Sequence, residues 1–238
     1  EKADFQASIR SDQAEGLLFL GTELEKQDLE HFKHISMPLV ILDTIFKSQA
    51  FDFVSINNMD SAYEIVEKII ENGHRDIGII NSAFQINNFR ERKLGYSQAI
   101  LDHHLILDTA IEALVEPTLE GSYKDMKQYL TALIKAGRQL PTAFFAVNDN
   151  IAIGAMKAIK EVSGKDIITI VGFDDIPLAE FCSPPLTTAK VDKVYYGRQA
   201  VRRLIDKIEN HDDNHLKLMI GTTIVERSSI QPNKKIKD

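Results

Sequence analysis

The chain has 238 residues, a mass of 26.8 kDa, 44% hydrophobic residues and a net charge of -7 at pH 7. This length allows one large domain or two modest ones, with enough apolar residues for a substantial core. The acidic balance argues against a strongly basic nucleic-acid surface on this segment, because phosphate contacts need clustered Lys and Arg. If the whole protein touches DNA, we expect another segment to make that contact.

Cysteine content and hydropathy indicate a cytoplasmic protein without membrane contact. The single cysteine, Cys182, excludes an internal disulfide framework, and we expect it to be a small packed side chain in a reducing compartment. No apolar stretch approaches the roughly 20 residues that span a bilayer. The charged start EKADF also lacks the apolar region of a secretory signal.

Strand-like and helical patterns alternate along the chain, which predicts the βαβ rhythm of a parallel sheet. GLLFLG at 16–21 reads as a buried strand. The best-defined helix is 60–72, with Asp60 as its expected N-cap and Gly73 as its stop. The other expected strands are 39–42, 77–80, 143–147, 167–171, 216–220 and 222–225, and the other expected helices are 92–101, 123–135, 151–160 and 197–209.

Four segments between these elements are expected to be irregular. VEPTLEGS at 115–122 reads as a loop, and the paired prolines of SPPLTT at 183–188 mark a rigid turn, because proline cannot continue a helix or a central strand. HDDNH at 211–215 reads as a solvated loop. The tail QPNKKIKD at 231–238 is expected to fray.

Four of the buried strands stop at a polar side chain. The residues at these ends are Asp43, Asn81, Asn148 and Asp174. In an open parallel α/β sheet a ligand binds just beyond the carboxyl ends of the strands. Two carboxylates and two amides at that place suit a neutral ligand rich in hydroxyl groups.

Arg92 lies at the expected start of the helix that follows strand 77–80. Its planar guanidinium can donate paired hydrogen bonds to vicinal hydroxyls or to a carboxylate. A solvated surface arginine is the alternative if position alone is considered. The polar strand ends across the expected cleft favour the binding role.

Several features could suggest a metal or a catalytic site, but each has a simpler interpretation. Asp174 and Asp175 are adjacent, so one can face the crevice while the other caps a turn, and a metal would need further carboxylates. His31 with His34, and the neighbours His103 and His104, fit a solvated helix face and a loop, because no HExxH or Cys/His pattern accompanies them. We therefore predict no metal ion.

Motifs of nucleotide and nucleophile chemistry are missing from the sequence. There is no GxGxxG after an early strand, no GxxxxGK[ST] and no GxSxG, and Cys182 has no evident histidine partner. We predict no catalytic residues and no cofactor.

The effector domain of the LacI/GalR family of bacterial transcription regulators resembles this chain, from about residue 16 to 230, in six ordered segments: LVILD, NGHRDIGII, RKLGY, TAFFAVNDNIAIGAMKAI, ITIVGFDDIPLAEFCSPPLTT and IVERSSI. Their order and spacing together make the resemblance specific. It implies two Rossmann-like lobes with parallel sheets joined by three crossovers, the periplasmic binding protein-like fold of type I.

The resemblance also implies how the chain is divided. The N-terminal, DNA-proximal lobe would hold 1–56 and 191–219, the C-terminal lobe 57–190 and 220–231, and 232–238 would be a tail. Family members begin with a helix-turn-helix, a hinge helix and a first βα unit, and we expect none of these within this chain.

Carried over residue by residue, the family's effector-binding positions fall on Asp43, Arg92, Asn148 and Asp174. Two positions depart from the family's pattern. Leu119 stands where several relatives place an aromatic ring that stacks on the ligand, and Val191, followed by Asp192, stands where many have Gln-Pro. We count both among the expected ligand-binding positions.

An aromatic shelf could come instead from Phe84 or Phe89, although packing explains each of them as well. The identity of the effector is therefore left open.

The function implied by the resemblance is the sensing of a sugar or related metabolite between the lobes, coupled in a homodimer to operator DNA through a segment outside this chain. A periplasmic-type sugar-binding protein for uptake is the alternative, and it would need export. A sugar-modifying enzyme is a third reading. It is disfavoured because Asp43 and Asp174 already have an adequate binding role.

Overall fold

The structure, a computed structural model, describes residues 14–47, 49–108, 111–164 and 168–233. They form two compact units. Unit 1 comprises the residues up to Ser55 together with Lys193–Ile220, and unit 2 comprises Ile56–Asp192 and the residues from Gly221 onward. The chain therefore passes between the units three times. Each unit is an α/β layer structure, which confirms the predicted fold class.

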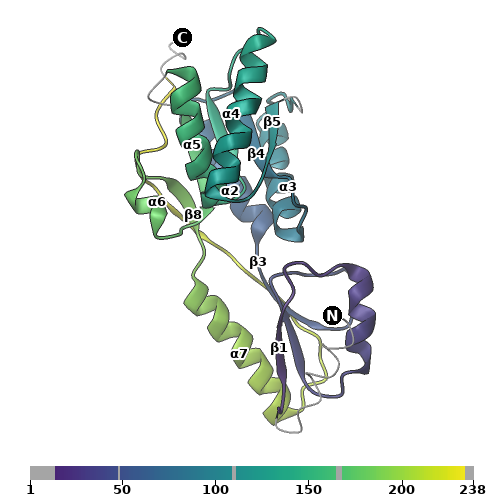
Figure 1. The fold of residues 1–238 in the computed structure, drawn as a ribbon. Helices are drawn as coiled ribbons and strands as arrows, with labels where there is room; N and C mark the ends of the chain where they lie inside the picture. Colours follow the sequence, from purple (N-terminus) through teal and green to yellow (C-terminus); the bar gives the residue numbers. More distant parts are fainter. Residues whose placement is uncertain (1–13, 48, 109–110, 165–167, 234–238) are drawn as a thin grey trace. The chain divides into compact units, whose positions relative to one another are not determined.

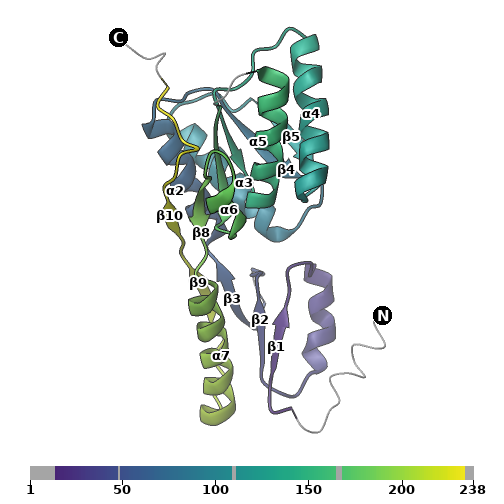
Figure 2. The same cartoon turned by 60° about the vertical axis from the view of Figure 1, so that its left-hand side comes forward.

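Unit 1 is built on a four-stranded sheet of order β1-β2-β3-β9, in which β1, β2 and β3 run parallel. Its elements are β1 (Leu17–Leu20), the 3-10 helix η1 (Lys26–His34), β2 (Leu39–Leu42), β3 (Asp52–Ile56), α7 (Lys193–Asn210) and β9 (Lys217–Ile220). Helices η1 and α7 flank this sheet (Figures 1 and 2). Because the apolar side chains of η1 pack on β2 and β3, a core forms from Leu29, Phe32, Leu39, Ile41 and Phe53.

The expected strand at 16–21 forms as β1, but the prediction that it is buried was wrong. Among the described strands it lies at the edge of the sheet, next to β2, and its last residue, Leu20, is 67% exposed. An apolar run alone cannot distinguish an edge strand from a central one, because the position depends on which strands pair.

A buried ion network joins β3 to the end of α7. The carboxylate of Asp52, which is 1% exposed, accepts a hydrogen bond from Arg203 Nε and lies 2.7 Å from Lys207 Nζ. Arg203 also donates to Asp212 and to the carbonyl of Asn214. The segment 211–215, expected to be a solvated loop, is therefore anchored through two of its residues.

Replacing Asp52 by Ala is expected to lower the free energy of unfolding by about 3–5 kcal/mol, because it leaves Arg203 and Lys207 without their buried counter-charge. Chemical denaturation measures this loss. Lys33→Ala is the matched control, since it removes an exposed ion pair with Glu30 and should cost less than about 1 kcal/mol. A loss of that small size for Asp52→Ala would contradict the network's role.

Unit 2 is built on a six-stranded sheet of order β10-β8-β7-β6-β4-β5. All neighbouring strands run parallel except β10, which is antiparallel to β8. The strands are β4 (Ile77–Ser82), β5 (Glu112–Val115), β6 (Ala143–Ala146), β7 (Thr169–Asp174), β8 (Thr187–Lys190) and β10 (Thr223–Val225).

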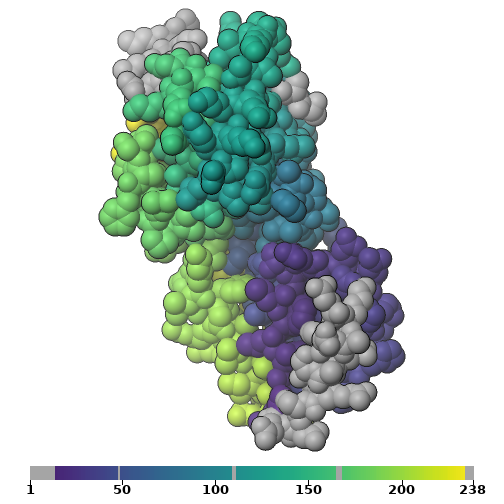
Figure 3. All heavy atoms as spheres, viewed as in Figure 1, coloured from purple at the N-terminus to yellow at the C-terminus, as the bar shows by residue number. Residues whose placement is uncertain are grey.

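Helices cover both faces of this sheet, as is usual for a parallel sheet. They are α2 (Asn58–Glu71), α3 (Asn87–Asp102), α4 (Leu119–Lys135), α5 (Asp149–Ser163) and the short α6 (Leu178–Phe181). The pair α4 and α5 covers one face and the pair α2 and α3 the other (Figures 1 and 2). The side chains of α4, drawn in teal, form a broad part of the surface of unit 2 in the space-filling view (Figure 3).

Helix α2 begins two residues before the predicted start. Asn57 is the N-cap, and its side chain accepts a hydrogen bond from the backbone N–H of Asp60, which lies in the first turn. The prediction that Asp60 is the cap was wrong, because Asn57 is an equally good capping residue three positions earlier. The helix ends at Glu71, and Gly73 follows with φ +86°, as a glycine stop requires.

Three strands escaped prediction, two of them because polar residues interrupt their apolar pattern. In β3 the charge of Asp52 is offset by Arg203, and in β8 the hydroxyls of Thr187 and Thr188 are buried through hydrogen bonds. The third, β5, is an edge strand of four residues. Helix α4 begins at Leu119, inside the expected loop 115–122, because Thr118 caps it through the N–H of Gly121.

Within the described residues, no helix combines the length and the apolar composition needed to cross a membrane.

Candidate ligand-binding site

Arg92 is the centre of the candidate site in unit 2. It lies in the second turn of α3, five residues after the helix begins, and is 5% exposed. Nε donates to Asn58 Oδ1 at 2.9 Å, Nη1 donates to the carbonyl of Val147 at 2.7 Å, and Nη2 lies 3.1 Å from Asp174 Oδ1. The guanidinium thus joins the start of α2 to the residues that follow or end β6 and β7. The alternative of a solvated surface arginine is wrong.

An aromatic ring supports the guanidinium from one side. The Arg92 Cζ atom lies 3.7 Å from the centroid of the Phe173 ring, a close cation-π contact, and 5.9 Å from the centroid of the Phe89 ring. Phe89 is buried, whereas Phe84 is 66% exposed. Phe89 therefore packs beside the arginine.

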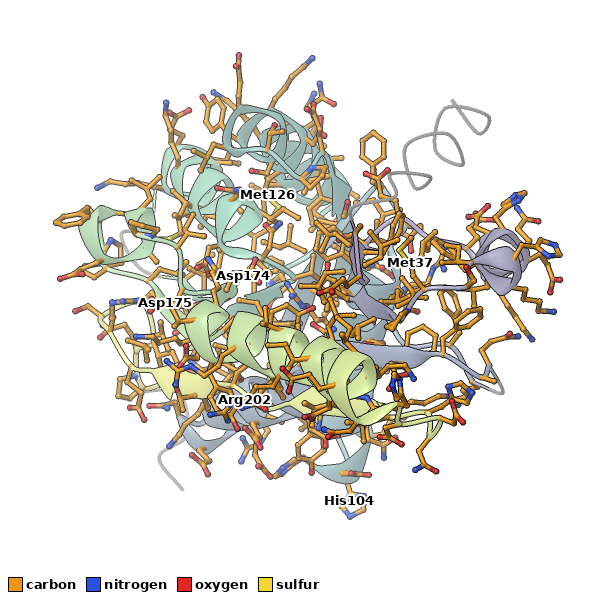
Figure 4. All side chains as sticks on the ribbon, turned by 90° about the horizontal axis from the view of Figure 1, so that it is seen from below. Met37, His104, Met126, Asp174, Asp175 and Arg202 are labelled. Atoms are coloured by element: carbon orange, nitrogen blue, oxygen red, sulfur yellow. The ribbon has the colours of Figure 1, made fainter. Side chains whose placement is uncertain are left out.

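Asp174 ends β7 and Asp175 follows it, both in the left-handed backbone region, with φ +109° and +51°. Their carboxylates have different partners: Asp174 pairs with Arg92, and Asp175 accepts a hydrogen bond from Arg227 Nη2 at 2.7 Å. Figure 4 labels both residues. The expectation that the two side chains diverge agrees with this geometry. The second carboxylate, however, forms an ion pair where the sequence suggested a cap.

Asn148 directly follows Val147, whose carbonyl receives the Arg92 bond, and is the N-cap of α5. Its Oδ1 accepts a hydrogen bond from the N–H of Ile151 at 2.8 Å, so one of its two polar atoms is committed to the helix. The amide nitrogen is the group with which this side chain can contact a ligand.

The third polar strand end in unit 2 does not join this cluster. Asn81 is buried, and its amide donates to Glu112 Oε1 at 3.1 Å while its oxygen accepts from the N–H of Ser82. It therefore ties β4 to the edge strand β5, on the opposite side of β4 from β6 and β7.

In unit 1, Asp43 occupies the equivalent place after β2. Its backbone is left-handed, with φ +67°, and its Oδ2 accepts a hydrogen bond from Thr22 Oγ1 at 2.6 Å. Its N–H donates to the carbonyl of Val54. The hydroxyl of Tyr196 donates to the same carbonyl, and burial, together with the charge of Asp43, raises the pKa of this tyrosine.

Leu119 and Val191 lie in unit 2, and Val191 directly follows β8. Leu119 is the first residue of α4 and is 39% exposed. Val191 is half-buried in the segment between β8 and α7. The ligand-binding role of both residues stays a prediction.

Sequence reasoning missed Asn58 and Asp149, two buried polar residues around the cluster. The amide of Asn58 accepts from Arg92 and donates to the carbonyl of Ile56 at 3.2 Å. Asp149 is fully buried and accepts hydrogen bonds from Thr188 Oγ1 at 2.6 Å and from the N–H of Ile176 at 2.9 Å. The available signal was their position, since each is the first residue of a helix that follows a buried strand.

Burial raises the pKa of Asp149 to about 7. The hydrogen bonds from Thr188 and Ile176 act in the opposite direction, while the charges of Asp174 and Asp175 raise the pKa further. Desolvation of the carboxylate therefore outweighs its two hydrogen bonds.

The other titratable candidates form ordinary contacts. His103 lies 3.0 Å from Glu67, and His31 and His34 are on the exposed side of η1. Cys182 is half-buried against the carbonyls of Ala179 and Pro184. In the part of the chain that the structure describes, no group of three or more His, Cys, Asp or Glu side chains could hold a metal ion.

Comparison with known proteins places this architecture. A model of the periplasmic binding protein-like domain matches residues 66–230. The chain is 33% identical over 222 residues to the ribose operon repressor of Haemophilus influenzae, over 92% of this chain and 64% of that protein. It is 29% identical over 220 residues to the probable HTH-type transcriptional repressor ExuR of Bacillus subtilis, over 90% and 64% of the two chains.

Solved structures agree with these relatives. A regulatory protein of the LacI family from Chloroflexus aggregans is similar with a TM-score of 0.84 and 25% identity, over 96% of this chain and 81% of that one. Two α/β units with three connecting passes, and in unit 2 an acidic strand end beside a buried arginine, are the architecture of a two-unit ligand-binding protein. The chain belongs to the periplasmic binding protein-like family, as an effector-binding domain of the LacI-family type. It spans about 64% of the length of the curated relatives named above.

The raised pKa of Asp149 has a consequence for stability. Its folded pKa of about 7 lies above the unfolded value of about 4, so between these values only the folded state holds the proton. The free energy of unfolding should therefore fall as pH rises from 4 to 7. Relative to Asp149→Asn, the wild type should gain on the order of 2 kcal/mol when the pH is lowered from 8 to 5.

Urea denaturation of both proteins at each pH measures this difference. Burial lowers the pKa of His74, which destabilises the fold on acidification, but both proteins carry this residue and its effect cancels. Parallel pH profiles for the two proteins would show that Asp149 stays ionised.

Proposed function

We propose that this chain is the effector-sensing domain of a LacI-family transcriptional repressor, and that it binds a neutral, polyhydroxylated small molecule such as a sugar. The observation that carries the proposal is the shared geometry of two strand ends. Asp43 and Asp174 each stop a parallel strand in a left-handed backbone conformation, and Asp174 faces the buried guanidinium of Arg92.

Backbone strain supports a functional role for both aspartates. A non-glycine residue in the left-handed region costs about 1–3 kcal/mol and persists only where the surroundings fix it, which is common at ligand-binding sites. Glycine would remove most of this cost in a loop that served only to connect elements. The side chain is therefore the part that function requires.

Hydroxyl groups match the donors and acceptors of this site. The three bonds of Arg92 use one N–H on each nitrogen, and within the described part of the chain one N–H remains on each of Nη1 and Nη2. The carboxylates of Asp43 and Asp174 accept, and the amide of Asn148 donates. A ligand that lacks matching groups leaves them unsatisfied, at about 1–3 kcal/mol for each buried one.

The charges favour a neutral ligand over an anionic one. Arg92 offsets Asp174, and Arg227 offsets Asp175. No cation pairs with Asp43 in the part of the chain that the structure covers, and its hydroxyl partner Thr22 is neutral. Lys190 Nζ lies 3.9 Å from Asp175 as well. These residues therefore carry no net positive charge for a phosphate or carboxylate, and the carboxylate of Asp43 would repel one.

The regulatory step requires the ligand to contact both units. We infer that unit 1 is the DNA-proximal lobe, predicted as 1–56 and 191–219, and that unit 2 is the other lobe, predicted as 57–190 and 220–231; the two units divide one or two residues away from these bounds. We infer too that Leu119 and Val191 lie near the bound effector. A ligand shifts the arrangement of two lobes only through unequal affinity for its states. The usual coupling of about 1–3 kcal/mol changes affinity for operator DNA by roughly 5–150-fold.

The competing functions have less support. A binding protein for uptake would share the fold, but the curated relatives named above are transcriptional repressors. A sugar-modifying enzyme would need an acid and base pair, whereas Asp174 is paired with Arg92 and the relatives are regulators. We place the full-length protein in the cytoplasm, where it reaches its operator.

The ligand class is tested by thermal shift with D-ribose, D-glucose, cellobiose and glucose 6-phosphate. At least one neutral sugar should raise the melting temperature, while glucose 6-phosphate should not, because these residues carry no net positive charge to balance the phosphate. Asp174→Asn should weaken binding of the stabilising sugar at least 10-fold by calorimetry, since its neutral amide accepts more weakly.

Lys93→Ala is the matched control for this test. Lys93 is the neighbour of Arg92 on α3 but forms a partly exposed ion pair with Glu112, so its loss should leave sugar affinity unchanged. Stabilisation by glucose 6-phosphate alone would contradict the neutral ligand, and full affinity in Asp174→Asn would contradict the site.

The assembly that we propose is a homodimer, because a change in the arrangement of the lobes can then alter the spacing between two DNA-binding modules. Light scattering on the full-length protein should give twice the mass of one chain at micromolar concentration. A strict monomer there would contradict the regulatory mechanism.

A further inference from the structure

The end of β7 and the first residue after it are two consecutive strained residues, and other groups must hold them in place. Asp174 and Asp175 both have positive φ. On the upstream side the ladder with β8 fixes the backbone up to the pairing of Asp174 with Lys190. On the downstream side the first N–H belongs to Ile176, and it donates to the side chain of Asp149 at 2.9 Å.

Asp149 is built into the structure on several sides. It is the first residue of α5 and is fully buried. One carboxylate oxygen accepts the Ile176 bond, and the other accepts from Thr188 Oγ1 on β8. A single side chain thus connects α5, β8 and the end of the strained loop.

The strand beside Asp149 leaves room for it. A Cβ atom at Gly172 would lie 2.1 Å from Asp149 Oδ1, a distance that no pair of unbonded heavy atoms tolerates. The backbone of β7 therefore approaches the carboxylate as closely as a glycine allows, two residues before Asp174.

We propose that Asp149 is the positioning residue of the ligand site: its carboxylate holds residues 174–176 so that Asp174 meets Arg92. The inference rests on the proposed function, in which Asp174 binds the ligand. Asp149 is itself buried and does not contact the ligand. Its effect on binding passes through Asp174.

Contacts of the neighbouring residues leave this task to Asp149. The Asp175 carboxylate pairs with Arg227, and this contact fixes the Asp175 side chain, which diverges from that of Asp174. The Ile176 carbonyl accepts from the N–H of Ala179, which begins the turn into α6. The Ile176 N–H, next to the strained pair, is held by Asp149.

The first test needs no ligand. Crystal structures of Asp149→Ala and Asp149→Asn are compared for the contact between Asp174 and Arg92. The asparagine keeps an acceptor for Ile176 and a donor for Thr188, so the contact should persist. In the alanine variant the loop should relax, with Asp174 leaving the left-handed region or moving out of reach of Arg92. An unchanged loop in Asp149→Ala would overturn the proposal.

The second test measures affinity for whichever of D-ribose, D-glucose or cellobiose stabilises the wild type most. Asp149→Ala should weaken binding at least 10-fold, and Asp149→Asn less than 3-fold. Thr188→Val is the matched control, because it removes the other hydrogen bond to the same carboxylate and leaves the Ile176 bond. Its affinity should stay within 3-fold of wild type, and a loss as large as that of Asp149→Ala would overturn the proposal.

A double-mutant comparison separates positioning from general damage. If Asp149 acts through Asp174, adding Asp149→Ala to Asp174→Ala should cause no further loss of affinity. An additive loss would overturn the proposal. If no sugar binds the wild type, the proposed function fails, and the crystallographic comparison still decides whether Asp149 holds the loop.

Discussion

The burial of one guanidinium governs the candidate ligand site of unit 2. A buried charge is stable only where hydrogen bonds and an opposite charge replace water. Arg92 meets this demand with acceptors from three places far apart in the sequence: Asn58, Val147 and Asp174. Since these residues lie at the start of α2, just after β6 and at the end of β7, the arginine fixes the relative positions of helix and strand ends. The arrangement that satisfies its charge also presents its remaining donors.

Unit 1 also contains buried charges, but they lie away from its polar strand end. Its buried ion network joins the start of β3 to the second half of α7 and consists of Asp52, Arg203, Lys207 and Asp212. Asp43 follows β2, at the opposite end of the parallel strands. The network binds the last helix of the unit to its central strand. Among the described residues, the hydroxyl of Thr22 and the carbonyl of Val54 hold Asp43, and no cation pairs with it. In our proposal the ligand binds at the carboxyl end of these strands, where the carboxylate of Asp43 is not used in a structural ion pair.

Elements with a clear apolar period could be predicted from the sequence, and those whose polar residues find tertiary partners could not. The stripe of α2 and the runs of β2, β4 and β6 show their burial locally. The burial of Asp52 in β3 depends on Arg203, which is 151 residues away.

The same division applies to the candidate site. The parallel topology places the polar residues that follow the strands at the same end of the sheet. Arg92 therefore contacts both Val147, the neighbour of Asn148, and Asp174. Asn81 ends the neighbouring strand, but Glu112 on β5 draws its amide to the other side. Gly172 and Asp149 show what such tertiary constraints mean for divergence. No side chain larger than hydrogen fits at position 172 while a carboxylate occupies position 149. Substitutions at the two positions are therefore coupled: a larger residue at 172 requires that Asp149 has already been replaced by a smaller residue.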